Sequence, residues 1–307
     1  MFEAFQLGPF LFRSHTLLLL IGVVLSTELF LRLAVSEGLR IAIFLKKAVW
    51  FFLGFLIGGR LLAVLLLHRV YTQDPMRMLI VWDGVFTVVG GCIGFGLVLL
   101  FFTWRQRGTF ISWIDVLVPA ATLLIAFDWL GRFFGALSYG KPTDVPWGVV
   151  LESMSVRYTV PIHPVQIYYA FWFFALTVFL LALRKKKHAT GLITLVGIVL
   201  TCVGVIFLEF LRGDFAISVF AKLSDFLFLG LLFASLGMIA VLEKRISHRT
   251  SLINSVLVGL GTAAYILLRP WVVVPSVEWR FSQFLCVLVI LATIVYVVAH
   301  RWKYQQH

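Results

Sequence analysis

Long apolar runs alternate with short polar stretches along most of this 307-residue chain. Each run is long enough to cross a hydrocarbon core of ~30 Å as a helix. The pattern predicts an all-α integral membrane protein, a polytopic bundle of about nine transmembrane helices with no soluble domain. The predicted spans lie near residues 16–35, 48–67, 79–103, 110–128, 164–183, 190–211, 223–242, 250–268 and 281–300.

One long polar interruption, at residues 128–163, breaks this pattern between the fourth and fifth spans. It contains tight-turn glycines, X-Pro sequences and several charged side chains. Because polar groups near a bilayer are costly, a polar island between spans is a hypothesis for a functional site. An ordinary folded loop outside the membrane is the alternative.

The composition supports a membrane protein. Hydrophobic residues make up 61% of the chain and charged residues 13%, whereas a soluble domain carries about 25% charged residues. The formal net charge of +12 could indicate nucleic-acid binding. The basic residues, however, lie in short clusters between apolar runs, where they set the orientation of the spans. We therefore expect no nucleic-acid partner.

The distribution of Lys and Arg predicts the orientation in the membrane. The densest cluster, Arg184 to Lys187, follows the fifth span, and other loops on that side are also clustered. Since cytoplasmic loops collect basic residues, we expect the N-terminus outside, the C-terminus in the cytoplasm and the polar island on the outer face. Trp147, Trp271 and Trp279 fall at predicted outer ends, as expected of an interfacial aromatic belt.

The cysteines and the N-terminus indicate no special processing. Cys92, Cys202 and Cys286 lie in apolar runs without CxxC spacing, so we expect neither a disulfide nor a metal site, and no cofactor. The N-terminus has no basic segment before its first apolar run. It is therefore not expected to be a removed signal peptide.

Arg60 is a charged side chain inside the second predicted span, directly after Gly58 and Gly59. Its guanidinium cannot be neutralised, so it needs a carboxylate, a carbonyl, water or a lipid phosphate as partner. A helix-locking pair with Asp83 or Glu209 is as reasonable as a lipid contact. Glycine pairs here and at Gly90-Gly91 permit close helix approach in either case.

Two further polar groups flank later spans. His163, Gln166 and Tyr168 lie where the fifth span begins after an X-Pro sequence. A His can act as a base near neutral pH, although a helix-capping His is more common. Glu209 and Arg212 close the sixth span at i,i+3 spacing, so they can pair with each other.

Seven short motifs, in this order, resemble those of the prolipoprotein diacylglyceryl transferase family. Members of that family are bacterial inner-membrane enzymes that move a diacylglyceryl group from phosphatidylglycerol to the lipobox cysteine of a prolipoprotein. The motifs are LGPF at Leu7, GGR at Gly58 to Arg60, WDG at Trp82 to Gly84, GG at Gly90-Gly91, YGKPT at Tyr139 to Thr143, HPxQxY at His163 to Tyr168 and EFxR at Glu209 to Arg212.

The resemblance implies a division of the chain. Residues 1–242 would form a transferase-like membrane domain of seven helices with the polar island 128–163 on its outer face. Residues 243–307 would add two transmembrane helices outside the resemblance. The family also implies the bacterial cytoplasmic (inner) membrane as the location.

Several positions depart from the family pattern. Val89 stands where the family has a His before its glycine pair, and Val205 stands where it has an essential Arg in the sixth helix. A first-helix Tyr is replaced by His15. In an alignment without gaps, the Arg of the family's Gly-Arg-x-Gly-Asn signature falls on Trp129 and its Asn falls on Arg132. A shift of three residues matches Gly131-Arg132 to the signature's Gly-Arg, but Gly135 then stands in place of the Asn. The Glu that follows HPxQxY in many members is Tyr169 here.

These departures lead to the interpretation that the chain is a diverged, non-catalytic relative. It would bind lipid or serve as a structural subunit of a membrane complex. The alternative is an active phosphatidylglycerol–prolipoprotein diacylglyceryl transferase with relocated residues. In that alternative, His15 or His163 would act as the base and Arg132 would hold the phosphate.

The expected partners follow from both interpretations. A phospholipid of the phosphatidylglycerol class is expected in either, a membrane-protein partner would dock on residues 250–300, and a prolipoprotein would bind if the chain is active. The residues expected to contact lipid are Arg60, Asp83, Tyr139, Gly140, Gln166, Glu209 and Arg212.

Overall fold

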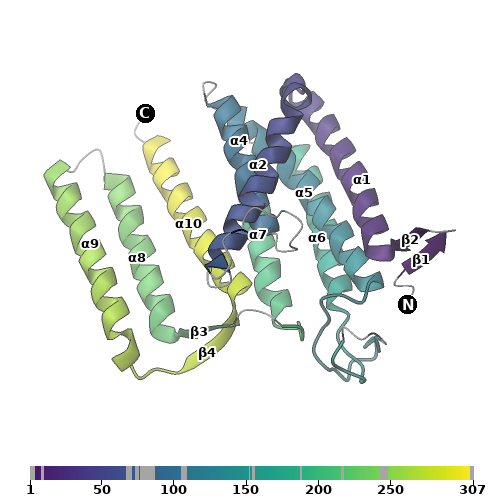
Figure 1. The fold of residues 1–307 in the computed structure, drawn as a ribbon. Coiled ribbons are helices and arrows are strands. Elements are labelled where there is room, and N and C mark those ends of the chain that lie inside the picture. The colour runs from purple at the N-terminus through teal and green to yellow at the C-terminus, as the bar shows by residue number, and fades with distance from the viewer. Residues whose placement is uncertain are drawn as a thin grey trace. The chain divides into compact units, whose positions relative to one another are not determined.

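The computed structural model describes residues 4–7, 10–66, 71–72, 76, 87–104, 109–151, 153, 156–186, 189–215, 218–242 and 248–304. Helices dominate this part of the chain (Figure 1), which confirms the predicted all-α class. The described helices are α1 Ser14–Ser36, α2 Ala42–Leu66, α4 Val88–Thr103, α5 Thr109–Phe134, α6 Val165–Arg184, α7 Leu192–Glu209, α8 Leu223–Leu242, α9 His248–Leu268 and α10 Phe281–Tyr304.

Seven of the described helices are long and apolar enough to cross a membrane, and α4 and α8 contain shorter apolar segments. The third predicted span, 79–103, corresponds to α4, which begins at Val88. Asp83 lies outside the described residues. The sequence pattern did not predict two short antiparallel pairs, β1 Ala4–Leu7 with β2 Phe10–Arg13 and β3 Ser218–Lys222 with β4 Ser276–Arg280.

The chain divides into two compact units. One unit combines residues 1–23, 122–183 and 195–307, and the other combines residues 24–121 and 184–194. Each unit has its own packing.

In the unit of residues 24–121, glycines bring α2 and α4 into contact, as their positions predicted. A Cβ added at Gly58 or Gly94 would overlap backbone atoms of the facing helix, and Gly54 contacts Gly94 directly. The Thr87 hydroxyl, just before α4, donates to the Gly59 carbonyl at 3.0 Å. Small residues at such a crossing let two backbones approach closely, so dispersion contacts hold the pair together.

Aromatic side chains fill the rest of that unit's core. Phe44 stacks on Phe51 with ring centroids 4.5 Å apart. Its edge also contacts the fully buried Trp113 of α5 at 4.7 Å. Contacts of this kind add about 0.5–1.5 kcal/mol beyond simple burial.

Asp115, on α5 in the same unit, fixes the start of α7. Its carboxylate accepts hydrogen bonds from the backbone N–H of Gly191 and of Thr194, and from the Thr194 hydroxyl. These contacts satisfy donors that a helix leaves open at its N-terminus. Asp115 is only 6% exposed, so these donors take the place of water around its carboxylate.

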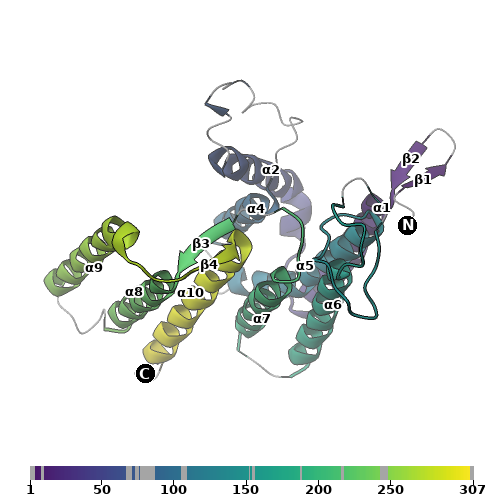
Figure 2. The ribbon, with the colours of Figure 1, turned by 90° about the horizontal axis from the view of Figure 1, so that it is seen from below.

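In the other unit, α8 lies between α9 and α10 (Figure 2), and β3 pairs with β4 at one end of these helices. Asp225 of α8 accepts two hydrogen bonds from Arg269 and one from the Tyr265 hydroxyl. The Lys222 ammonium donates to the carbonyls of Arg269 and Val272. These polar contacts therefore tie α8 and β3 to α9 and to the residues that follow it.

Between α5 and α6, the described residues of the polar island form a loop without regular strands. Isolated bridges join Gly140 to Arg212, and Ile162 to both Pro142 and Val149. Tyr139, Leu151 and Ile162 form a small buried cluster beneath it. The loop is thus an ordered cap fixed to the end of α7.

Candidate functional site

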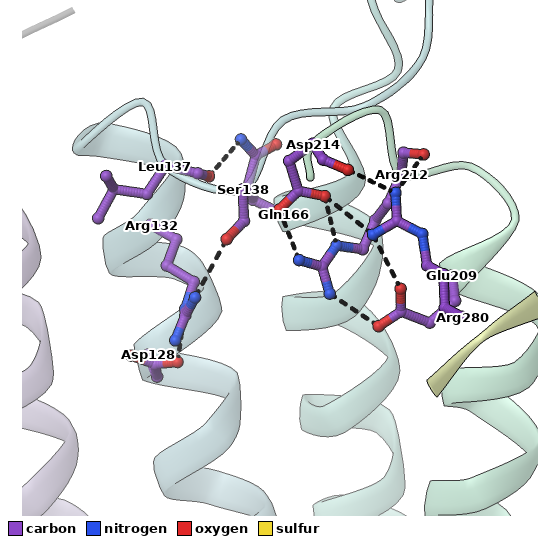
Figure 3. Close-up of polar contacts among 9 residues, drawn as sticks. All are labelled: Asp128, Arg132, Leu137, Ser138, Gln166, Glu209, Arg212, Asp214 and Arg280. Carbon is purple, nitrogen blue, oxygen red and sulfur yellow. Dashed lines mark hydrogen bonds and ion pairs between the residues drawn. The ribbon is translucent and has the colours of Figure 1, made fainter. Parts of the chain in front are cut away.

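Asp128, on the last turns of α5, binds two basic side chains at once. Its Oδ1 lies 2.9 Å from His15 Nε2. Its Oδ2 accepts a hydrogen bond of 2.7 Å from Arg132 Nε, one helical turn later (Figure 3). The side chains of His15 and Asp128 are about one quarter exposed, at 25% and 24%. His15 and Arg132, both expected to carry chemistry, are therefore brought together.

The end of α5 gives Arg132 a second partner. The helix closes with backbone bonds from Gly135 to Gly131 and from Leu137 to Arg132. Ser138 then adopts a positive φ of 55°, a conformation that is unusual for a residue with a Cβ. In this position its hydroxyl accepts a hydrogen bond of 3.1 Å from Arg132. Positive-φ backbone of this kind costs about 1–3 kcal/mol and concentrates at functional sites.

Trp129 lies beside two guanidinium groups. Its ring is 5.1 Å from the guanidinium carbon of Arg132 and 5.4 Å from that of Arg212. Tyr169 of α6 stacks on the same indole with centroids 3.9 Å apart. The residues that replace the family's Arg and Glu, Trp129 and Tyr169, thus form an aromatic support for cations.

A cluster of two carboxylates and two guanidinium groups closes α7. Arg212 donates to Glu209 at 2.7 Å and to both oxygens of Asp214, at 3.0 and 2.6 Å. Arg280 of β4 donates to Asp214 at 3.1 Å and lies 3.3 Å from the second Glu209 oxygen. The predicted Glu209–Arg212 pair is confirmed. Asp214 and Arg280, which the prediction did not include, complete the cluster (Figure 3).

The opposite charges of this cluster stabilise one another. Burial acts to lower the pKa of Arg212, but hydrogen bonds to Asp214 and the charges of Glu209 and Asp214 raise it above its ordinary value. Because the pKa is raised, the folded protein stabilises the charged form, and this stabilisation is fully present at every pH below the pKa of a free guanidinium. Arg212 is therefore a permanent cation just after the C-terminal end of α7.

Gln166, Tyr139 and Gly140 connect the loop to α6. Gln166 is fully buried and donates from Nε2 to the Leu137 carbonyl at 2.9 Å. Its Oε1 has no hydrogen-bond partner among the described residues. Tyr139 is buried against Tyr158, and Gly140 contacts the His163 backbone so closely that no Cβ would fit. This glycine is needed because the two chain segments touch.

His163 lies in a different polar group from His15. Its Nδ1 is 3.4 Å from the Tyr168 hydroxyl, which also accepts a hydrogen bond of 2.6 Å from Trp147 Nε1. Its backbone N–H donates to the Lys141 carbonyl. These contacts of His163 are those of a residue that organises the loop.

Arg60 belongs to the other compact unit. Its guanidinium lies 5.1 Å from the ring of Tyr71, which is buried. Asp83 is outside the described residues. Glu209, the other carboxylate considered for Arg60, binds Arg212 and Arg280. The lipid-binding role of Arg60 stays a prediction.

A polar pocket of about 350 Å³ adjoins the charged cluster. Glu209 and Asp214 contribute from the end of α7, and Lys141 contributes from the loop. The remaining wall comes from Phe210, Phe215, Glu278, Trp279, Arg280 and Gln283. Residues of β4 and α10 therefore line a pocket beside the EFxR motif. In the described part of the chain, no group of three or more His, Cys, Asp or Glu residues is arranged to hold a metal ion.

Four polar residues of this region were not among the predicted site residues. Asp128 lies four residues before Arg132, which was predicted, and this i,i+4 spacing could have identified Asp128 as its partner. Asp214 follows the EFxR motif directly and could have been found in the same way. Ser138 and Arg280 gave no such signal, because a positive φ and a contact across 66 residues leave no local pattern.

Comparisons with known proteins place this geometry in a family. The sequence model of the prolipoprotein diacylglyceryl transferase family matches residues 3–299, which extends beyond residue 242, the predicted end of the transferase-like domain. A phosphatidylglycerol–prolipoprotein diacylglyceryl transferase of Synechococcus sp. (strain CC9902) is 33% identical over 201 residues, 62% of this chain and 70% of the relative. Relatives of the same name from Parasynechococcus marenigrum (strain WH8102) and Tolumonas auensis (strain DSM 9187 / NBRC 110442 / TA 4) are 30% identical over 221 residues and 33% identical over 202.

These matches correct one interpretation of the sequence. The chain was interpreted as a non-catalytic lipid-binding or structural subunit because valines occupy positions 89 and 205. A match over residues 3–299, with many relatives named as transferases, outweighs two substituted positions. The interpretation as a pseudoenzyme is therefore wrong. The chain is a multi-pass membrane protein, and it belongs to the prolipoprotein diacylglyceryl transferase family.

Proposed function

We propose that this protein transfers the diacylglyceryl group of phosphatidylglycerol to the lipobox cysteine of a prolipoprotein. The family match over residues 3–299 and the names of its relatives support this function. In the reaction, the cysteine sulfur forms a bond to the terminal glycerol carbon, and the bond from that carbon to the phosphate oxygen breaks. Glycerol phosphate leaves with the electron pair, and the thiol proton passes to a base.

His15 is the proposed base. An ionised carboxylate only accepts hydrogen bonds, so the contact with Asp128 fixes the proton of neutral His15 on Nε2. The lone pair is then on Nδ1, ready to take a proton. An acid that orients a histidine in this way selects its tautomer and stabilises the imidazolium that forms. A cysteine thiol, only a few per cent ionised at neutral pH, needs such help.

Arg132 and Arg212 are the proposed phosphate-binding groups. Each lies beside Trp129, and each keeps N–H donors beyond those used in the hydrogen bonds described above. Preorganised cations facing a departing phosphate stabilise charge that develops in the transition state, typically by several kcal/mol. These arginines would take the role of the residue replaced by Val205.

The remaining predicted contacts are proposed as substrate-shaping groups. The unpartnered Oε1 of Gln166 can accept a hydrogen bond from a glycerol hydroxyl. Tyr139 and Gly140 hold the loop against α7. Arg60 and Asp83 are proposed to contact the lipid from the GGR and WDG motifs, as the sequence predicts. His163 is the second candidate base.

We also propose the bacterial cytoplasmic membrane as the location, with the N-terminus outside and the C-terminus in the cytoplasm. The reaction then takes place on the outer face, where the polar island lies. The boundary between a domain of residues 1–242 and two additional helices stays a prediction. So does docking of a membrane partner on residues 250–300, where α9 exposes apolar side chains such as Leu252, Val256 and Leu260.

The function is tested in a bacterium depleted of its own transferase, with membrane insertion of this chain verified. Growth and a diacylglyceryl-modified lipoprotein are expected. The same assay on H15Q and H163Q separates the two bases: H15Q is expected to fail and H163Q to retain transfer. A well-inserted wild-type chain that leaves the lipoprotein unmodified, both in cells and in detergent with phosphatidylglycerol, refutes the proposal.

A further inference from the structure

The C-terminal segment contributes an arginine to the cluster at the end of α7. Besides its contacts with Asp214 and Glu209, Arg280 donates from its second terminal nitrogen to the carbonyls of Arg212 and Asp214, both at 2.9 Å. One guanidinium thus binds both carboxylates and the backbone between them. The Arg280 side chain is 15% exposed, so water competes weakly for these donors.

Neighbouring residues hold Arg280 in this position. Its backbone N–H donates to Gln283 Oε1, and Gln283 Nε2 donates to the Ile206 carbonyl of α7, both at 2.9 Å. Gln283 is buried, with 2% exposed. Trp279 packs against Phe210 with ring centroids 5.9 Å apart. Arg280 is therefore presented by a fixed strand and not by a mobile tail.

The charge balance of the cluster depends on this residue. Glu209 and Asp214 supply two negative charges, and Arg212 supplies one positive charge. Arg280 supplies the second positive charge, and the cluster becomes neutral. Without it, one uncompensated negative charge would remain directly behind Arg212. A like charge in a partly buried site acts over several ångströms because screening by water is weak there.

We infer that Arg280 is a positioning residue for the anionic lipid substrate. It neutralises the surplus carboxylate and leaves Arg212, beside Trp129, available to the phosphate. This inference rests on the proposed transferase function and deepens it. It assigns a role in substrate binding to β4, a strand that lies after the last family motif recognised in the sequence.

A purely structural role is the competing explanation, and the chain offers a matched control. Arg269, in the same C-terminal segment, also makes a two-pronged ion pair, with Asp225. Loss of either arginine removes one guanidinium from a carboxylate. Of the two arginines, only Arg280 shares its carboxylate partners, Glu209 and Asp214, with the proposed phosphate-binding residue Arg212.

The test uses the purified full-length protein in detergent micelles with increasing mole fractions of phosphatidylglycerol and saturating lipobox peptide. R280Q is expected to raise KM for phosphatidylglycerol about tenfold with kcat within about twofold, the signature of lost substrate binding. R280K keeps the charge and is expected to restore most of the affinity. R269Q is expected to lower the melting temperature without changing KM.

Equal effects of R280Q and R269Q on melting, with KM unchanged in both, would overturn the inference. If R280Q does not accumulate, the double variant R280Q/D214N replaces it, since its cluster is neutral again. A KM about tenfold above that of wild type in this double variant would then count against the inference. If the wild-type protein shows no turnover, the proposed function fails, and binding of phosphatidylglycerol vesicles to wild type and R280Q still decides the role of Arg280.

Discussion

His15 and Arg132 hydrogen-bond to opposite oxygens of one carboxylate, that of Asp128. The proposed base and the proposed phosphate-binding group are thus oriented by the same side chain. The thiol that loses its proton and the phosphate that departs must be positioned relative to each other, and a shared acid fixes part of that geometry.

Replacing Asp128 by Asn is expected to lower kcat by about 100-fold or more. An amide can donate to His15 Nε2, and the imidazole then carries its proton on Nδ1, where the lone pair is needed. Initial rates at saturating phosphatidylglycerol measure the effect. D144N, at an exposed acid of the same region, is the control and should keep the wild-type rate. A D128N rate within about threefold of wild type would remove Asp128 from the proposed mechanism.

Replacing Glu209 by Ala is expected to destabilise the fold by about 3–5 kcal/mol. Glu209 is 4% exposed and pairs with two guanidinium groups, so its loss leaves Asp214 alone to compensate two positive charges in a largely buried cluster. The midpoint of denaturant unfolding in detergent measures this. E28A removes an exposed i,i+4 pair with Arg32 and is expected to change stability by less than about 1 kcal/mol. Equal midpoints for the two variants would contradict the prediction.

Replacing Gly94 by Ala is expected to lower the melting temperature, at a cost of about 1–3 kcal/mol. The added Cβ would overlap the Gly54 carbonyl of the facing helix, so α2 and α4 would have to separate. Gly96, two residues later on α4, faces no atom within 4 Å of an added Cβ. G96A is therefore expected to be neutral or stabilising, and the sign of the difference between the variants is the decisive result.

Replacing Asp115 by Ala is expected to lower the free energy of unfolding by about 2 kcal/mol or more. The reason is that three hydrogen-bond donors at the start of α7 lose their shared acceptor. Hydrogen–deuterium exchange should accelerate at Leu192–Glu209, most of all at its N-terminus. E37Q, which weakens the exposed end of the Arg184 ion pair, should leave that exchange unchanged. Unaltered exchange in D115A would mean that the packing of α7 alone holds its first turn.

The spans could be predicted because bilayer thickness imposes one length on every apolar run. The run 223–242, for example, became α8 with the same limits. Gly58 and Gly90 could be interpreted correctly because a missing side chain has one simple consequence, close approach. Glu209 and Arg212 were three residues apart on one helix end, where local spacing decides.

Other contacts depend on tertiary structure and left no such trace. His15 and Asp128 are 113 residues apart and meet only after α1 packs against α5. The β3–β4 pair joins residues 218–222 to 276–280, each too short and irregular to read as a strand. The valines at 89 and 205 were given too much weight, because a sequence shows which side chain is missing and not which other side chain has moved into its place.

The pairing of Arg280 with Asp214 has a consequence for biosynthesis. Asp214 leaves the ribosome 66 residues before Arg280, the arginine that completes the neutralisation of the cluster. At about 5–20 residues per second, that delay is about 3–13 seconds. During that interval, Glu209 and Asp214 carry one negative charge more than Arg212 compensates. Water at the membrane surface must solvate this surplus charge. The cluster at the end of α7 is therefore completed only after residue 280 has been made, and a nascent chain arrested before that residue would lack the Arg280 contacts.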